Sequence, residues 1–261
     1  MTKHHTRREL IGASPINSEL VDYLNQARSP SHNQLAPCVA LIGCDGSGKS
    51  TLARDLVSLL NRNINTRSVY LGLGTGDFGR RIAKLPLVGG VVSRFLQNKA
   101  SKAHEGRDKR LPGLATALAM FGLSLTRRHR FREALKYRKK GVQIVTDRYP
   151  QAELAGGFDG PGLNSARKGS PLVEYLARRE QSIYRQMAAY QPTVIIRLNV
   201  DVDTALARKA DHERALLEKK IAVLPTLSFA GARIVDIDAT RPYGDVLAST
   251  LAVLQRFGLR A

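Results

Sequence analysis

The sequence predicts an α/β fold in which a parallel sheet is covered by helices on both faces. Short apolar runs alternate with longer segments of helical periodicity five times along the 261 residues. Such alternation is typical of parallel strands joined by crossover helices. A glycine-rich loop directly follows the first apolar run, as in α/β proteins that bind phosphates. With 43% hydrophobic residues, the chain can build one large core, with room for an added segment.

The glycine-rich loop lies between a predicted strand, Val39 to Ile42, and a helix with leucines at helical spacing. It reads G-x-x-x-x-G-K-S from Gly43 to Ser50, which is the pattern of a phosphate-binding P-loop. Glycines allow successive backbone N–H groups to face one anion, and the helix N-terminus adds partial positive charge. Lys49 is expected to reach the β- and γ-phosphates of a nucleoside triphosphate, and the Ser50 hydroxyl to hold Mg²⁺. The residues predicted to bind the nucleotide are Gly43, Cys44, Gly46, Ser47, Gly48, Lys49, Ser50 and Thr51.

The chain before this loop and the chain after the first helix carry weaker signals. Residues 1–36 are predicted to form an N-terminal extension with one short helix, and residues 37–261 the domain itself. A second strand, Val69 to Leu71, leads into a glycine-rich loop over residues 72–79. That loop is expected at the carboxyl end of the sheet, where ligands bind in open α/β folds.

A basic segment follows and is predicted to be a helical insertion over about residues 80–140. The chain has a formal net charge of +19, and this segment holds 17 Lys and Arg against three acidic residues. Residues 127–140 are expected to be the charged extension of a helix that ends at Gly141. The surplus indicates either an anionic partner, such as nucleic acid or an anionic membrane surface, or a solvated basic face. The residues predicted to pack this helix on the core are Leu114, Leu118, Met120, Phe121 and Leu125.

The third strand, Val142 to Val145, runs into Asp147-Arg148-Tyr149. An aspartate at the end of an apolar strand is the second half of a P-loop enzyme's metal site, so Asp147 and Ser50 together predict bound Mg²⁺. The alternative is an aspartate that only caps the following turn. Residues 151–170 contain five glycines and are expected to form a mobile loop.

The rest of the chain supplies the remaining layers of the fold. Its predicted elements are a helix over Pro171 to Met187, a strand over Pro192 to Asn199, a helix from Thr204 that Asp203 caps, a strand over Arg233 to Ile237, and a final helix over Val246 to Phe257.

Four pieces of the chain together resemble the thymidylate kinase family of P-loop nucleoside monophosphate kinases. They are residues 44–51, 147–149, 208–214 and 237–240. This resemblance implies the sheet order 2-3-1-4-5 and Mg²⁺-ATP as the phosphate donor. It also implies that Asp45 orients the acceptor, that Asp147 lies near the metal, and that Arg148 grips the acceptor's phosphate.

The resemblance further implies where a catalytic arginine and the adenine lie. Some family members carry that arginine in the P-loop, where this chain has Ser47, and others supply it from a lid after the fourth strand. The lid is expected at about residues 207–222, with Arg208 or Arg214 as the catalytic residue. Ala239 and Thr240 are expected beside the adenine.

The departures from the family concern the acceptor. The family's Arg-Glu-Pro-Gly-Gly loop is replaced by residues 72–76, and the residues that frame the base are replaced by Pro150 to Ala155. The expected acceptor is therefore a nucleoside monophosphate, of which dTMP is one candidate, or else a nucleoside or non-nucleotide compound. A third possibility is an ATP-binding protein that uses its basic segment to bind nucleic acid. The oligomeric state is open, and includes a homodimer.

Two further features bear on the class of protein. Asp159 to Gly162 fits the D-x-x-G pattern of GTPases, and Asn98 to Ser101 resembles N-K-x-D. The second ends in a serine, which cannot accept hydrogen bonds as a carboxylate does, so a GTPase is not favoured. The absence of an apolar leader, an uncharged run of at most 16 residues, and two cysteines predict a soluble, cytoplasmic protein.

Overall fold

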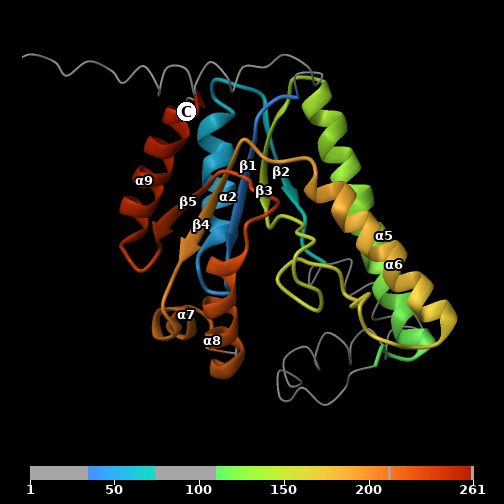
Figure 1. Cartoon of the computed structure of the whole chain (residues 1–261). Helices are drawn as coiled ribbons and strands as arrows, with labels where there is room; N and C mark the ends of the chain where they lie inside the picture. Colours follow the sequence, from blue (N-terminus) through green and yellow to red (C-terminus); the bar gives the residue numbers. More distant parts are fainter. Residues whose placement is uncertain (1–34, 74–109, 211–212, 260–261) are drawn as a thin grey trace, which may run out of the picture. The chain divides into compact units, whose positions relative to one another are not determined.

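The computed structural model describes residues 35–73, 110–210 and 213–259. Five parallel strands form one sheet in the order β2-β3-β1-β4-β5 (Figure 1). This result confirms the predicted fold class and strand order. The strands are β1 (Cys38–Gly43), β2 (Thr66–Tyr70), β3 (Gln143–Asp147), β4 (Val194–Asn199) and β5 (Ile234–Asp238). The predicted N-terminal helix and the predictions for residues 74–109 lie outside the described residues.

Helices cover both faces of the sheet, because successive side chains of a strand point to opposite faces. On one face Val39 and Leu41 of β1 pack with α2 (Lys49–Leu60) and α9 (Tyr243–Arg256). On the other face Ala40 and Ile42 pack with α5 (Leu114–Lys139) and α6 (Pro171–Ala188). Figure 1 shows the two pairs on opposite sides of the strands. The carboxyl ends of the strands remain for the loops that carry the predicted site.

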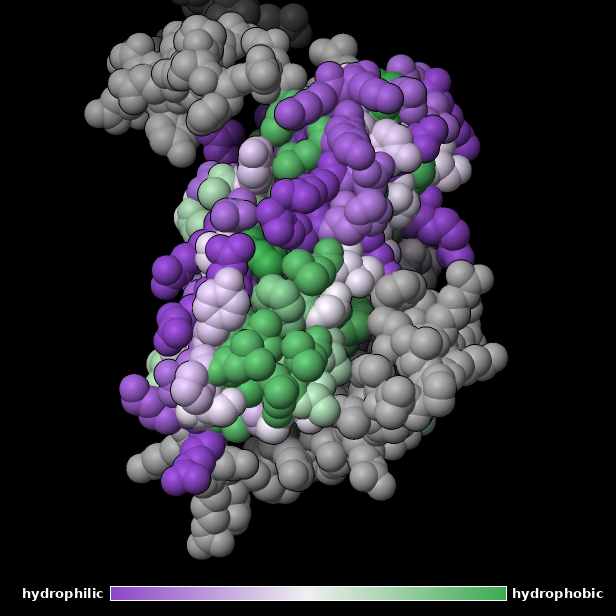
Figure 2. Space-filling model, turned by 90° about the vertical axis from the view of Figure 1, so that its right-hand side faces the viewer, coloured by the Kyte–Doolittle hydropathy of each residue, from purple (hydrophilic) through white to green (hydrophobic). Residues whose placement is uncertain are grey.

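The helix α5 ends where the sequence predicted, but it differs from the prediction in the face it buries. Gly141 follows its end with φ 80°, as predicted for a helix terminator. Leu114, Leu118 and Leu125 were expected in the core, but they are 42–51% exposed. Leu172 of α6 is exposed as well, and Figure 2 shows an apolar patch on the side of the molecule where α5 and α6 lie.

The buried stripe of α5 instead includes two basic residues that were predicted to belong to a charged extension. Its members recur every three or four residues and face the sheet and α6: Ala117, Met120, Ser124, Arg127, Phe131, Ala134 and Arg138. Met120 of this stripe was among the predicted core residues, and Phe121 packs half-buried against the core. The prediction was wrong for the three exposed leucines, which belong to the more apolar of two stripes with helical spacing. Among the described residues, no helix is long and apolar enough to cross a membrane.

The segment after β4 forms two short helices, α7 (Val202–Arg208) and α8 (Arg214–Val223), and a 3₁₀ turn, η1 (Leu224–Thr226). The cap of α7 is Asp201, whose Oδ1 accepts a hydrogen bond from the Thr204 N–H at 2.7 Å. The prediction of Asp203 as the cap was wrong by two residues, because the helix begins at Val202. Residues 211 and 212 of the predicted lid lie outside the described residues.

Candidate functional site

The P-loop connects β1 to α2 in the strand–loop–helix arrangement predicted. Gly46 and Gly48 have φ 83° and 88°, values that residues with a side chain rarely adopt. A Cβ on Gly46 would also lie 2.5 Å from the Ala205 carbonyl oxygen. Gly48 directly precedes α2, so the loop's backbone N–H groups continue into a helix N-terminus, an arrangement that binds anions.

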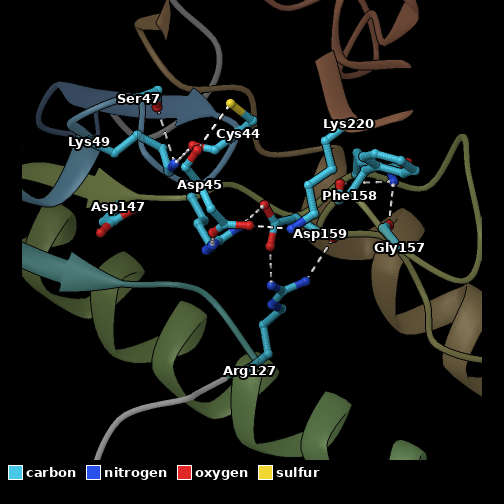
Figure 3. Close-up of polar contacts among 12 residues, drawn as sticks. Cys44, Asp45, Ser47, Lys49, Arg127, Asp147, Gly157, Phe158, Asp159 and Lys220 are labelled. Carbon is cyan, nitrogen blue, oxygen red and sulfur yellow. Dashed lines mark hydrogen bonds and ion pairs between the residues drawn. The ribbon is translucent and has the colours of Figure 1, made fainter. Parts of the chain in front are cut away.

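Lys49 lies inside this loop. Its side chain is buried, and its Nζ donates hydrogen bonds to the Cys44 carbonyl at 2.5 Å and to the Ser47 hydroxyl at 3.3 Å (Figure 3). Burial, followed by the nearby positive charge of Arg148, lowers the pKa of Lys49 to about 8. A buried ammonium of this kind is stabilised by an anion, and a nucleotide phosphate in the loop would supply one.

Ser50 and Asp147 meet across the gap between α2 and β3. The Ser50 hydroxyl donates a hydrogen bond to Asp147 Oδ2 at 2.6 Å. The other carboxylate oxygen, Asp147 Oδ1, is buried and has no hydrogen-bond partner within the described part of the chain. Mg²⁺ favours oxygen ligands and is usually bound by one or two protein groups together with substrate phosphates. The two residues therefore fit the predicted ion.

Asp45 links the P-loop to two basic side chains. Its Oδ1 accepts a hydrogen bond from Arg148 Nη2 at 3.1 Å, and its Oδ2 forms an ion pair with Lys220 of α8. Burial opposes ionisation of this carboxyl, but Lys220 and Arg148 outweigh it and hold the pKa of Asp45 well below its usual range. The sequence did not predict a role for Lys220. It predicted a lid rich in charged residues here, and no spacing distinguished one of them from the others.

Arg148 directly follows β3 in a left-handed conformation, with φ 75°. Its backbone N–H donates to the Leu41 carbonyl at 2.9 Å, which fixes it beside β1. The guanidinium lies between two carboxylates, with Nη2 on Asp45 and Nη1 3.5 Å from Asp159 Oδ2. Asp159 raises the pKa of Arg148 against the effect of burial, and Asp45 adds to this. A non-glycine residue at positive φ is strained, and such strain is common at functional sites.

Arg127 of α5 forms an ion pair with the same carboxylate, that of Asp159 (Figure 3). Its Nη2 donates to Asp159 Oδ1 at 2.7 Å, and its Nη1 to the Asp159 backbone carbonyl at 2.7 Å and to the Tyr184 hydroxyl at 3.1 Å. The Arg127 side chain is fully buried. The sequence analysis missed Arg127 because it counted the residue in a basic run, and it considered Asp159 only as part of a GTPase pattern.

The two candidate lid arginines occupy different places. Arg208 Nη1 donates to the Ala239 carbonyl at 2.8 Å and lies 3.5 Å from the Gly46 carbonyl, so it joins the P-loop to the segment predicted beside adenine. In the same segment, the Thr240 N–H and hydroxyl donate hydrogen bonds to Asp238 Oδ1 at 2.9 and 2.6 Å. Arg214 instead forms an exposed ion pair with Asp203 at 2.5 Å and a longer one with Glu218 at 3.9 Å.

The fold and these contacts define a P-loop ATP-binding protein with a kinase-like α/β sheet. No protein-family model matches the chain. The chain is 41% identical over 225 residues to the "Uncharacterized ATP-binding protein YghR" of Escherichia coli strain K12, covering 86% of this chain and 89% of that protein. It is 42% identical over 217 residues to the "Uncharacterized ATP-binding protein YghS" of the same strain, covering 83% and 91%. The chain belongs to the family of these ATP-binding proteins.

A more distant similarity extends to a named enzyme. The shikimate kinase of Rhodococcus jostii is 28% identical over 166 residues, which cover 59% of this chain and 86% of the kinase. This similarity agrees with the kinase-like sheet order and P-loop. Together the relatives support a P-loop, ATP-binding, kinase-like protein.

Proposed function

We propose that the protein is a Mg²⁺-ATP-dependent phosphotransferase. The observation that carries the proposal is the Ser50–Asp147 hydrogen bond beside the P-loop, with a buried carboxylate oxygen left over. A P-loop alone would indicate nucleotide binding. A hydroxyl and a carboxylate at the position of the metal, next to a buried lysine, indicate phosphoryl transfer, in which positioning and charge neutralisation do most of the work.

Each residue of the site has a role in this mechanism. The loop N–H groups and Lys49 bind the β- and γ-phosphates, and Ala239 and Thr240 lie beside the adenine. Ser50 and Asp147 hold Mg²⁺, which when bound neutralises charge on the phosphates. Asp45 orients the acceptor, while the cations that hold it, Arg148 and Lys220, offset the negative charge of the γ-phosphoryl group.

The reaction itself exchanges one bond for another. The acceptor oxygen forms a bond to the γ-phosphorus, the bond from that phosphorus to the β–γ bridging oxygen breaks, and ADP leaves with the electron pair. A hydroxyl acceptor also loses a proton, which passes to water. Arg208 holds the Ala239 carbonyl, so it positions the donor end of the site.

Two classes of acceptor are candidates. The resemblance to thymidylate kinases suggests a nucleoside monophosphate, dTMP among them. A hydroxyl compound without a phosphate is the second candidate. It is favoured by the two carboxylates on Arg148, the residue that would bind the acceptor's phosphate, and by the distant relative whose name is that of a kinase for a non-nucleotide acceptor.

The proposal is tested by measuring ADP formation from Mg²⁺-ATP with a panel of nucleoside monophosphates, nucleosides and small alcohols. The control is Lys49→Ala, which removes the buried ammonium from the P-loop. Acceptor-dependent ADP formation above this control supports a phosphotransferase, and the productive compound names the acceptor. Tight ATP binding without turnover on any compound would contradict the proposal.

A further inference from the structure

Arg148 presents its two terminal nitrogens to two different carboxylates. Nη2 is hydrogen-bonded to Asp45 and Nη1 is ion-paired with Asp159. An arginine that grips a phosphate does so with this same pair of nitrogens, in a bidentate fork. A phosphate on the acceptor would therefore compete with Asp45 and Asp159 for Arg148.

Asp159 is held firmly on the side away from Arg148. Arg127 binds both its Oδ1 and its backbone carbonyl, each at 2.7 Å. Because Arg127 is fully buried, its charge requires a partner inside the protein, and moving Asp159 away would remove the carboxylate that pairs with it directly. Phe158 and Asp159 also adopt left-handed φ values of 52° and 65°, a strained conformation that surrounding contacts must maintain.

Those contacts come from the loop that carries Asp159, which was predicted to be mobile. Gln151 is fully buried, and its Nε2 donates to the Leu154 and Phe158 carbonyls at 2.8 and 3.2 Å. Its Oε1 accepts from the Glu153 and Leu154 N–H groups at 2.6 and 2.8 Å. A longer bond from Nε2 reaches the Gly157 carbonyl at 3.5 Å. One side chain thus makes five hydrogen bonds within the loop.

A second set of hydrogen bonds joins this loop to the turn before β5. The Glu153 carboxylate accepts hydrogen bonds from the Ser228 N–H at 2.8 Å, the Ser228 hydroxyl at 3.0 Å and the Ala230 N–H at 2.9 Å. Phe229 and Ala230 have φ 50° and 57°, so consecutive N–H groups of this turn can bind one carboxylate as a backbone nest does. The loop is therefore built to present Asp159 at a fixed place.

We propose that Asp159 determines the class of acceptor: its fixed carboxylate occupies the place on Arg148 that an acceptor's phosphate would need, so the site selects a hydroxyl compound without a phosphate. The inference rests on the proposed function and specifies its substrate. A hydroxyl group can donate a hydrogen bond to a carboxylate, whereas a phosphate is repelled by one. Asp159 thereby favours the first class and disfavours the second.

The test uses pairs of compounds that differ only by a phosphate, such as thymidine and dTMP, cytidine and CMP, or glycerol and glycerol phosphate. In the wild type, kcat/KM for ADP formation is expected to be higher with an unphosphorylated member than with its phosphorylated partner, whose KM is expected to be high. In Asp159→Asn, the KM for the phosphorylated members is expected to fall about tenfold or more, the value of one charge-assisted hydrogen bond. The matched control, Glu133→Gln, removes an exposed carboxylate paired with Lys136 on α5 and should leave every KM unchanged.

Phosphate binding can be measured directly, so that the inference is tested even if no acceptor is phosphorylated. Calorimetry with inorganic phosphate in the presence of Mg²⁺-ADP should show affinity about tenfold higher for Asp159→Asn than for the wild type, because Nη1 of Arg148 loses its competing carboxylate. Because loss of Asp159 alone removes the direct ion-pair partner of buried Arg127, the double variant Arg127→Met, Asp159→Asn is measured as well and should also bind phosphate more tightly than the wild type.

The outcomes separate the two proposals. If no compound is turned over above Lys49→Ala, the proposed function fails, and the phosphate titrations still decide on Asp159. A wild type that phosphorylates dTMP or another monophosphate, with a KM that rises in Asp159→Asn, would overturn the inference. Equal phosphate affinity in the wild type and both variants would overturn it too.

Discussion

The proposed donor half of this site, around Lys49 and Asp147, and the proposed acceptor half, around Asp45 and Asp159, use charge in opposite ways. In the donor half, Lys49 is buried beside neutral oxygens and has its pKa lowered to about 8, and Asp147 keeps a buried oxygen without a hydrogen-bond partner in the described residues. In the acceptor half, Asp45 and Asp159 are each shared between two basic side chains.

This difference in charge indicates which kind of ligand each half would bind. Groups that are buried without full compensation gain most when a ligand of opposite charge arrives. The donor half therefore favours a polyanion together with a divalent cation. The acceptor half is neutralised internally, so it gains little from another anion and can instead offer hydrogen bonds to an uncharged compound.

Among the variants that test this difference between the halves, Lys49→Ala is expected to lose the most activity. Removing the buried ammonium from the loop should lower acceptor-dependent ADP formation by about 10²–10³-fold or more, as expected when a preorganised charge on the reacting phosphate is lost. Steady-state kinetics measures the loss, with Lys219→Ala, an exposed lysine on α8, as the control. Activity within a few-fold of the wild type would show that Lys49 does not bind the phosphates.

A second effect follows from the pKa of Lys49, which is about 8 in the free protein. A bound triphosphate favours the charged lysine, so the nucleotide binds the protonated form. Below pH 8 the lysine is already charged and the affinity should not depend on this group. Above pH 8 binding must take up a proton, and the affinity for ATP should fall by up to about tenfold per pH unit.

Calorimetric titrations of ATP from pH 7.5 to 9.5 at constant Mg²⁺ would show this decline. The matched variant is Lys49→Arg, because a guanidinium stays charged throughout this range. Its profile should be flat. A flat wild-type profile would contradict the assigned place of Lys49 in the donor half.

The acceptor half should respond more weakly, and Lys220→Ala tests its outer ion pair. The variant leaves Asp45 with one strong partner, Arg148, and removes a cation from the mouth of the P-loop. We expect kcat to fall about tenfold, less than for Lys49 because Lys220 is partly exposed. Lys219→Ala again serves as the control, since that residue lies next to Lys220 on α8. An effect as large as that of Lys49→Ala would abolish the distinction between the two halves.

The smallest effect concerns the lid arginines. Arg208→Ala removes the hydrogen bond to the Ala239 carbonyl and should raise the KM for ATP several-fold, about the value of one hydrogen bond, with the acceptor KM unchanged. Arg214→Ala is the matched comparison, because Arg214 pairs with exposed Asp203. It should change either KM by less than about twofold. A larger loss in Arg214→Ala than in Arg208→Ala would instead indicate that Arg214 is the catalytic arginine.

The donor half could be predicted from the sequence far better than the acceptor half, because most of its residues lie close together in the chain. The P-loop is encoded by consecutive residues, since glycines at set positions fix the backbone and the following helix fixes the direction of Lys49 and Ser50. Asp147 was predictable because a strand end places it beside that loop. The sheet order followed from the resemblance and the alternation of strands and helices, and the structure confirms it.

The acceptor half depends on contacts that no local pattern specifies. Arg127 and Asp159 are 32 residues apart and meet only because α5 buries its less apolar stripe. In the sequence, Arg127 is one of a run of basic residues. Arginine side chains are rarely fully buried, so nothing in this run predicts that Arg127 lies in the core. The loop around Gln151 looked mobile because it is rich in glycine, whereas one buried amide fastens it. Tertiary packing, rather than local preference, determined each of these.

The most direct test of the central claim is the Mg²⁺ dependence of ATP binding, measured with a non-hydrolysable ATP analogue in the wild type and in Asp147→Asn. We expect Mg²⁺ to raise the affinity of the wild type about tenfold or more, because Ser50 and Asp147 supply its protein ligands. The variant should bind the analogue with nearly the same affinity whether or not Mg²⁺ is present. A wild type that is indifferent to Mg²⁺, or a variant that keeps the full gain, would contradict the assignment of the donor half.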